Sequence, residues 1–352
     1  MKLRLTELLI IGTIVAAAPS LAQTYNIQDL GLARGTTYPL GIGLNDVGQA
    51  CGFCESPNGP VATFSSDGQV IVLDPTNPND IASAKGIDNS GDVVGFELPN
   101  KAPVNIERAL IWRNGGKAQD ITSTSIFPGG EEALAVNKVS GEVVGLGFTS
   151  APINNEWHMF TYANGQTVDL GPSTASGEPI AINDSGVMLV NFTNGTQAIF
   201  SNGTFTPIAQ PPNATATANA INNSGVVVGE IDYNTNTIVP HAGLYSNGVW
   251  TDLGTLSSAA RETRAVSINS SGQIIGLAEG KPIYKPVSTI PTMSCILQNG
   301  TWVELNSLIP TNSGFNLNLS VPVSINDAGQ ILIDVRTATG GFYANVLLTP
   351  TQ

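Results

Sequence analysis

The chain has 352 residues, of which 27 are acidic and 14 basic, so its net charge is −13. This acidic balance argues against nucleic acid as a partner, because the phosphate backbone would be repelled. With 38 Gly, 22 Pro and 41% hydrophobic residues, the composition favours a core built from many short strands and tight turns rather than from helices.

The first 22 residues are typical of an export signal. Lys2 and Arg4 give a positive start, residues 8–18 form an apolar core, and small residues stand at Ser20 and Ala22. The apolar core is shorter than the roughly 20 helical residues needed to span a bilayer. We therefore expect cleavage after residue 22. Residues 23–352 are then a single exported domain without a membrane span, in the periplasm or the medium.

A short turn recurs along the rest of the chain, and an apolar run follows each copy. The copies are LNDVG at 44–48, IDNSG at 87–91, VNKVSG at 136–141, INDSG at 182–186, INNSG at 221–225, INSSG at 268–272 and INDAG at 325–329. Asn and Asp tolerate left-handed backbone, and the closing Gly adopts it without steric cost. The Asp residues lack the alternating spacing of a calcium loop, so we assign them to turn chemistry and predict no metal site.

A second signal follows in six of the seven units. There Asn-Gly or Asp-Gly separates two apolar runs, as in 109–121, 159–171, 198–208 and 243–254. This pattern predicts a β-hairpin with a type I′ turn. Each unit thus contains four strands in about 45 residues, which is the size of a propeller blade.

The last unit ends after a third strand near Phe342–Thr349, and its fourth strand is missing. The segment Asn26–Gly31 resembles the fourth strands of other units, for example Val168–Gly171. Pairing this segment with the last blade would close a ring and remove two open sheet edges. The sequence therefore predicts an all-β, seven-bladed β-propeller of four-stranded antiparallel blades, closed by the N-terminal strand.

The repeat resembles the HAF family of extracellular bacterial repeat proteins. The matching pieces are Asp252–Leu256, Ser267–Asn269 with Gly272, His241–Tyr245 with Asn247–Gly248, and His158–Phe160 with Asn164–Gly165. The histidine is kept in only two units, and the double glycine of the family pattern after Asp-Leu-Gly is absent. The resemblance implies an exported protein and implies no activity.

Few residues carry recognisable chemistry. His158 and His241 occupy the same position in two units. A recurring position favours a structural role over a catalytic or metal-binding one, and we expect each side chain to satisfy backbone groups. Cys51 and Cys54 lie in one predicted strand, and the sequence alone does not decide whether they form a disulfide. We predict no catalytic constellation, no metal and no cofactor.

The predicted topology places the variable loops at one end of every blade, and loops on a rigid scaffold are where binding groups gather. We call this end the long-loop face, and the opposite end the tight-turn face. The candidate ligand-binding residues on the long-loop face are Arg34, Glu131, Trp157, Arg261, Arg264, Tyr284 and Lys285, with Glu132, Glu262 and Lys281 beside them.

The first functional hypothesis is a secreted, non-enzymatic scaffold that binds an extracellular protein or carbohydrate. One alternative is a lyase or hydrolase of extracellular polysaccharide, with a carboxylate or Arg site on the propeller axis. Another is a structural component of the cell surface or matrix. The sequence does not name the ligand.

Overall fold

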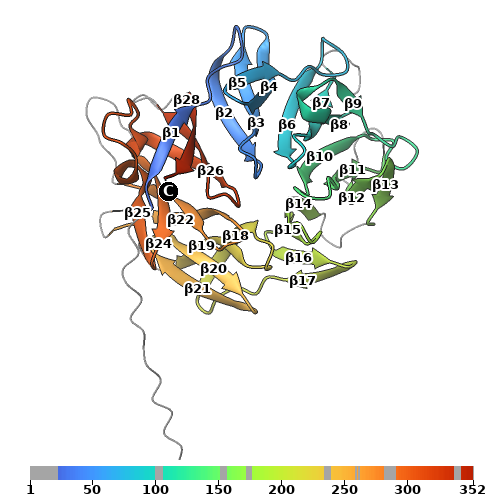
Figure 1. Cartoon of the computed structure of the whole chain (residues 1–352). Helices are drawn as coiled ribbons and strands as arrows, with labels where there is room; N and C mark the ends of the chain where they lie inside the picture. The colour runs from blue at the N-terminus through green and yellow to red at the C-terminus, as the bar shows by residue number, and fades with distance from the viewer. Residues whose placement is uncertain are drawn as a thin grey trace, which may run out of the picture.

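The computed structural model describes residues 23–99, 106–150, 157–171, 177–233, 239–257, 260, 262–280, 291–336 and 342–351. These residues form seven four-stranded sheets, arranged as blades around a central axis (Figure 1). The predicted seven-bladed propeller is confirmed. Residues 1–22 lie outside the described part of the chain. In the described part, no helix is long and apolar enough to cross a membrane.

Each blade runs from an innermost strand A through B and C to an outermost strand D, and neighbouring strands are antiparallel. Blade 1 contains β2 (Thr37–Leu44), β3 (Ala50–Ser56), β4 (Gly59–Ser66) and β5 (Gln69–Val72). Blade 2 contains β6 (Ile81–Ile87), β7 (Val93–Leu98), β8 (Arg108–Trp112), the 3-10 turn η1 (Arg113–Gly115) and β9 (Ala118–Asp120). Blade 3 contains β10 (Glu131–Val136), β11 (Val143–Phe148), β12 (Trp157–Ala163) and β13 (Gln166–Asp169).

The remaining blades repeat this order. Blade 4 contains β14 (Gly177–Ile182), β15 (Met188–Phe192), β16 (Gln197–Ser201) and β17 (Thr204–Pro207). Blade 5 contains β18 (Ala214–Ile221), β19 (Val227–Tyr233), β20 (His241–Ser246) and β21 (Val249–Gly254). Blade 6 contains β22 (Glu262–Ile268), β23 (Ile274–Glu279), β24 (Thr292–Gln298) and β25 (Thr301–Glu304), followed by η2 (Leu305–Leu308) and η3 (Leu317–Leu319).

Blade 7 joins the two ends of the chain. It contains β26 (Ser320–Ile325), β27 (Ile331–Arg336), β28 (Phe342–Pro350) and the N-terminal strand β1 (Tyr25–Asp29). Strand β1 is antiparallel to β28, with Tyr25 opposite Pro350, and the Thr351 N–H donates to the Thr24 carbonyl at 2.9 Å. Figure 1 shows this pairing as a blue strand beside a red one. The predicted ring closure is confirmed.

The hairpin turns between strands C and D follow the predicted geometry. Both central residues have positive φ in six blades, as a type I′ turn requires. These pairs are Asp67–Gly68, Asn114–Gly115, Asn164–Gly165, Asn202–Gly203, Asn247–Gly248 and Asn299–Gly300.

The turns between strands A and B differ from the predicted backbone geometry. Their closing glycines have positive φ, but the first Asn of each turn does not. Instead its side chain forms hydrogen bonds. In Asn222, Oδ1 accepts from the N–H groups of Ser224 and Val226, both at 3.0 Å, and Nδ2 donates to the Asn269 carbonyl of the next blade at 3.2 Å.

The same contact to the next blade recurs around the ring. The other donors are Asn45, Asn137, Asn183, Asn269 and Asn326, whose Nδ2 atoms donate at 2.8–3.0 Å. Asp88 occupies this position in blade 2 and has no amide to donate. There the Asn89 N–H donates to the Lys138 carbonyl at 2.9 Å instead. The repeated Asn therefore joins neighbouring blades as well as shaping its own turn.

The glycine that closes most B-strand runs is required by close packing. Strand β18 carries a bulge between Ala218 and Ala220, and a Cβ atom on Gly229 of β19 would lie 1.8 Å from the Thr217 carbonyl oxygen. A Cβ atom on Gly52, Gly95 or Gly145 would likewise lie 1.9–2.0 Å from a carbonyl oxygen of strand A. A side chain cannot be accommodated at that distance.

The hydrophobic core lies between adjacent blades rather than inside any one of them. Between blades 1 and 2, for example, the buried side chains of Phe64 and Leu73 pack with Ile87, Leu110 and Trp112. Burial on both faces explains why the B strands carry apolar residues on both faces.

Candidate functional site

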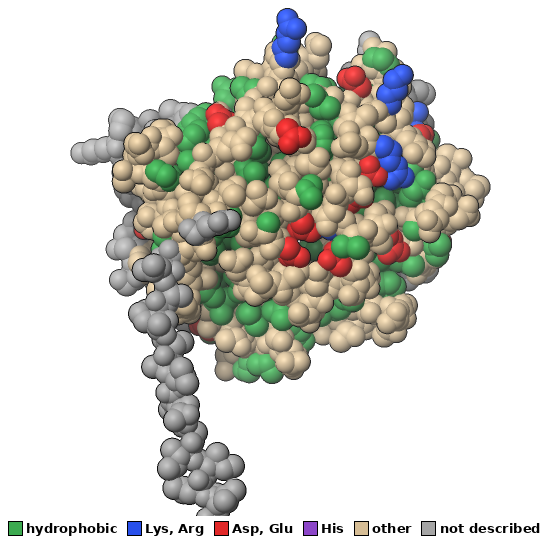
Figure 2. Space-filling view, viewed as in Figure 1, with side chains coloured by type: hydrophobic (Ala, Val, Ile, Leu, Met, Phe, Trp, Pro, Cys, Tyr) green, Lys and Arg blue, Asp and Glu red, His purple; other side chains and the backbone are tan. Residues whose placement is uncertain are grey.

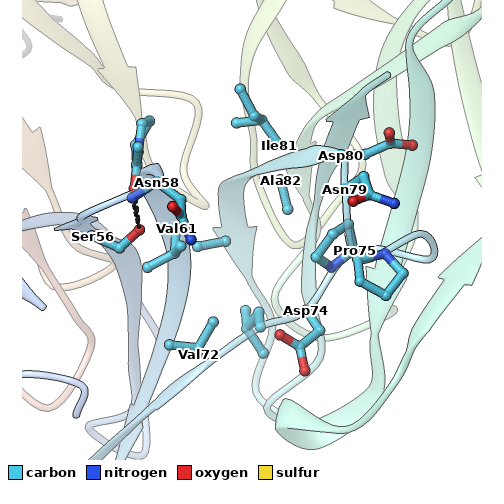
Figure 3. Close-up of a pocket in the computed structure, with 15 residues that line it drawn as sticks. Ser56, Asn58, Val61, Val72, Asp74, Pro75, Asn79, Asp80, Ile81 and Ala82 are labelled. Atoms are coloured by element: carbon cyan, nitrogen blue, oxygen red, sulfur yellow. Dashed lines mark hydrogen bonds between the residues drawn. The ribbon is translucent and has the colours of Figure 1, made fainter. Parts of the chain in front are cut away.

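A cavity of about 490 Å³ lies between blades 1 and 2 on the long-loop face (Figure 3). It is lined by residues 56, 58–62, 72–75 and 78–82. These residues come from the β3–β4 loop, from β4, and from the connection that leads from β5 to β6. The volume lies within the range of small-ligand pockets, about 300–1,000 Å³.

Buried polar contacts fix the connection that forms one wall of this cavity. Arg108 Nη2 lies 2.7 Å from Asp80 and 2.7 Å from Glu97, whose side chain is completely buried. The Thr76 N–H donates to Glu97 at 2.7 Å, and Trp112 Nε1 donates to the Asp74 carbonyl at 2.7 Å. The connection is therefore held at three residues, Asp74, Thr76 and Asp80, so the cavity is shaped before any ligand arrives.

A pair of carboxyl groups lies where blades 2 and 3 meet. Glu132 is on the innermost strand β10, and its side chain shares a hydrogen bond with Glu107. Burial, followed by the charge of Glu107, raises the pKa of Glu132 to about 7. Lys85 and Glu178, on the innermost strands of the flanking blades, also act on Glu132 electrostatically. Two carboxyl groups that share a proton can act as an acid and a base.

Arg264 is surrounded by acidic side chains. Its guanidinium contacts Glu262, lies 3.6 Å from Glu279 and lies 3.8 Å from Glu230. The sequence placed Arg264 among the ligand-binding residues, and the structure shows that three carboxylates already engage its charge.

The other predicted residues that the structure describes are separated from one another at the long-loop end. Arg34 is exposed in the connection before β2. Glu131 is fully buried, where its Oε1 accepts from the Ser123 N–H at 2.7 Å and its Oε2 has no partner among the described residues. Trp157, the first residue of β12, is half-buried. Arg261, Lys281, Tyr284 and Lys285 lie outside the described residues. None of the predicted residues that the structure describes lines the cavity between blades 1 and 2.

Both histidines pair with an aspartate of the neighbouring D strand. His158 Nδ1 lies 2.9 Å from Asp169, and His241 Nδ1 lies 2.9 Å from Asp252. The predicted backbone partner is therefore wrong for Nδ1, which contacts a carboxylate in both histidines. The signal was present in the sequence, because each His precedes its Asp by 11 residues.

The cysteines are free thiols. Cys51 and Cys54 are both buried and unbridged. Residues three apart on strand β3 project to opposite faces, so the disulfide that the sequence left open does not form. Burial raises the pKa of Cys51 to about 12, which keeps it a thiol near neutral pH.

A small opening of about 60 Å³ lies on the axis at the tight-turn face, with Lys138, Asp184 and Asp327 among its lining residues. Figure 2 shows acidic side chains grouped around the centre of the face that it displays. Among the described residues, no group of three or more His, Cys, Asp or Glu side chains could hold a metal ion.

No family model matches the chain, and no curated protein matches its sequence. Several solved structures are similar in fold. A streptogramin B lyase is 12% identical with a TM-score of 0.54, over 93% of this chain and 98% of its own. A YCF48 structure with bound D1 peptide is 13% identical with a TM-score of 0.51, over 97% and 100%.

Prolyl oligopeptidase B from Galerina marginata is 7% identical with a TM-score of 0.58, over 89% of this chain and 49% of the oligopeptidase. This chain thus spans about half the length of that enzyme. The three similar proteins include two enzymes and one peptide complex. At these low identities the similarity establishes the propeller fold alone.

Proposed function

We propose that this chain is an exported, non-enzymatic binding protein, which holds an extracellular protein or carbohydrate on its long-loop face. The cavity between blades 1 and 2 is the observation that carries the proposal. It combines apolar walls, such as Val61 and Ile81, with a few polar side chains, such as Asn58 and Asp74. Concave sites of this composition on a rigid scaffold are typical of ligand binding.

The position of the cavity also supports the proposal. It is formed by the B–C loop of blade 1 and by the connection to blade 2, which belong to the variable end of the blades. The export signal of the sequence would bring this face into contact with extracellular material.

The test is capture from the native culture, together with a glycan array, using the purified protein. Asn58 is exposed at the tip of the β3–β4 loop, so Asn58→Trp should fill the cavity mouth without disturbing the core. Thr204→Trp is the matched control, since Thr204 is an exposed residue beside a tight turn. We expect Asn58→Trp alone to lose the captured ligand. Equal capture by both variants would reject this site.

A second candidate function rests on the Glu107–Glu132 pair. A polysaccharide lyase or hydrolase needs one carboxyl group that gives a proton to the leaving oxygen and a second group that acts as a base. A pKa of about 7 keeps Glu132 largely protonated in mildly acidic surroundings, as such an acid requires.

Assays for new reducing ends and unsaturated products separate the two candidates. If the chain is an enzyme, Glu132→Gln should abolish product formation, whereas Glu142→Gln, beside the tight turn of the same blade, should leave it unchanged. Absence of products from every captured glycan would favour the binding protein.

A further inference from the structure

The cavity between blades 1 and 2 is rich in hydrogen-bond acceptors and poor in donors. Among the described residues, its lining contains no Lys, Arg or His, and three of its residues are prolines, which have no backbone N–H. These prolines are Pro60, Pro75 and Pro78.

Many of the remaining backbone donors near the cavity are already used. The Leu73 N–H donates to the Ala62 carbonyl at 2.8 Å, and the Asp80 N–H donates to the Asn77 carbonyl at 2.9 Å. The Asn79 N–H donates to the side chain of Asn77 at 3.3 Å. These contacts favour a ligand that brings its own donors.

The charged side chains among the described lining residues, Asp74 and Asp80, are both acidic. Arg108 contacts Asp80 and the buried Glu97. In Figure 3 the Asp80 carboxylate points away from the Ser56–Val61 side of the cavity. The Asp74 side chain is exposed, and its carboxylate has no ion-pair partner among the described residues. Asp74 is thus the free anionic group of the lining.

One strand edge beside the cavity is open. Strand β5 pairs with Thr63–Ser66 of β4, whereas β4 begins four residues earlier, at Gly59. The Ala62 carbonyl accepts from Leu73, so by the alternation of an antiparallel ladder the next carbonyl on this edge belongs to Pro60. An extended backbone lying here would find an acceptor and no competing N–H.

We propose that this cavity binds a lysine or arginine side chain on an extended peptide segment of a partner protein. The methylene stem would lie against Val61, Val72 and Ile81, and the cationic head would meet Asp74. This inference rests on the proposed binding function and names its ligand. The net charge of −13 adds long-range attraction for such a segment.

The test measures binding of a fluorescein-labelled peptide, Ala-Lys-Ala-Lys-Ala, by fluorescence anisotropy at about 0.1 M salt. The matched peptide carries acetyl-lysine, which keeps the stem and removes the charge. Asp74→Asn removes the carboxylate in the cavity. Asp67→Asn makes the same charge change on the tight turn of the same blade, where Asn suits the positive φ.

We expect acetylation and Asp74→Asn each to weaken binding roughly tenfold, and Asp67→Asn to weaken it less than about twofold. Equal losses from the two variants would overturn the proposal, because net charge alone would then explain binding. Equal binding of the acetylated peptide would also overturn it.

A separate outcome distinguishes this inference from the proposed function. If a natural partner or glycan is captured equally by the wild type and by Asp74→Asn, the binding function stands and the cation site is rejected. If the lysine peptide binds through Asp74 but nothing extracellular is captured, the cation site stands and the proposed function fails.

Discussion

The two faces of this propeller are built on opposite principles. On the tight-turn face, six Asn side chains make the same bond to the next blade, and six C–D turns share one geometry. On the long-loop face, three intervals between blades differ from one another: a cavity follows blade 1, a carboxyl pair lies between blades 2 and 3, and Arg264 binds carboxylates of blades 5 and 6. The repeated positions hold the ring together, and the positions that depart from the repeat are free to bind ligands.

The largest expected effect is at a repeated glycine. Gly229→Ala would place a Cβ atom 1.8 Å from the Thr217 carbonyl oxygen, so strand β18 would have to move. We expect a loss of about 3 kcal/mol in the free energy of unfolding, measured by urea denaturation. A loss below about 0.5 kcal/mol would show that the bulge of β18 can move to accept the methyl group. The repeated glycine would then not be needed to hold the ring together.

A repeated asparagine should have the next largest effect. Asn222→Ala removes one bond to the next blade and two bonds within its turn, and it leaves buried backbone groups unpaired. We expect a loss of about 2 kcal/mol of stability, with ligand capture unchanged. Ser224→Ala, at an exposed position of the same turn, is the control. Loss of capture in folded Asn222→Ala would contradict the division between faces.

Replacing Asp88, which stands where the other six turns have Asn, should stabilise the protein. Burial raises the pKa of Asp88, so its charged form is disfavoured where the other blades use an amide. Asp88→Asn keeps the acceptor for Ser90 and Asp92 and adds a donor toward blade 3. A gain of about 1 kcal/mol is expected in urea denaturation. A loss would mean that the carboxylate has a role of its own.

A further prediction is a dependence of stability on pH. Burial raises the pKa values of Glu131, Glu132 and Asp334 to about 7, above the ordinary carboxyl value of about 4. Between these values the folded protein binds more protons than the unfolded chain, so stability falls as pH rises from about 4 to 7. Thermal melts should show this slope, and Asp334→Asn should reduce it. A melting temperature that rises over the same range would contradict the assignment.

The fold was predictable because its signals are local and repeated. Asn-Gly pairs such as Asn164–Gly165 identify the hairpins, and the missing last strand is visible from the sequence near Asn26. The second role of the turn Asn was not predictable from one unit, because its Nδ2 partner lies in the next blade, 47 residues along the chain for Asn222.

From the sequence, the candidate site was predictable only as a location on the long-loop face, and the residues that line the cavity were not. Glu131 was expected near ligand, yet the chain buries it, because its side chain folds back to Ser123. The cavity depends on the way the connection is held by Arg108 and Glu97, which are contacts that no periodicity encodes. Asp74 lies two residues after the end of β5 and belongs to no repeated motif that would mark it as a binding group.

The most direct measurement is hydrogen–deuterium exchange of the protein alone and with the extracellular protein or glycan that it captures. Ligand on the long-loop face should slow exchange in residues 56–62 and 73–82, which line the cavity. The tight turns at 45–48 and 222–225 should be unchanged. Protection confined to those turns would contradict the proposed binding face.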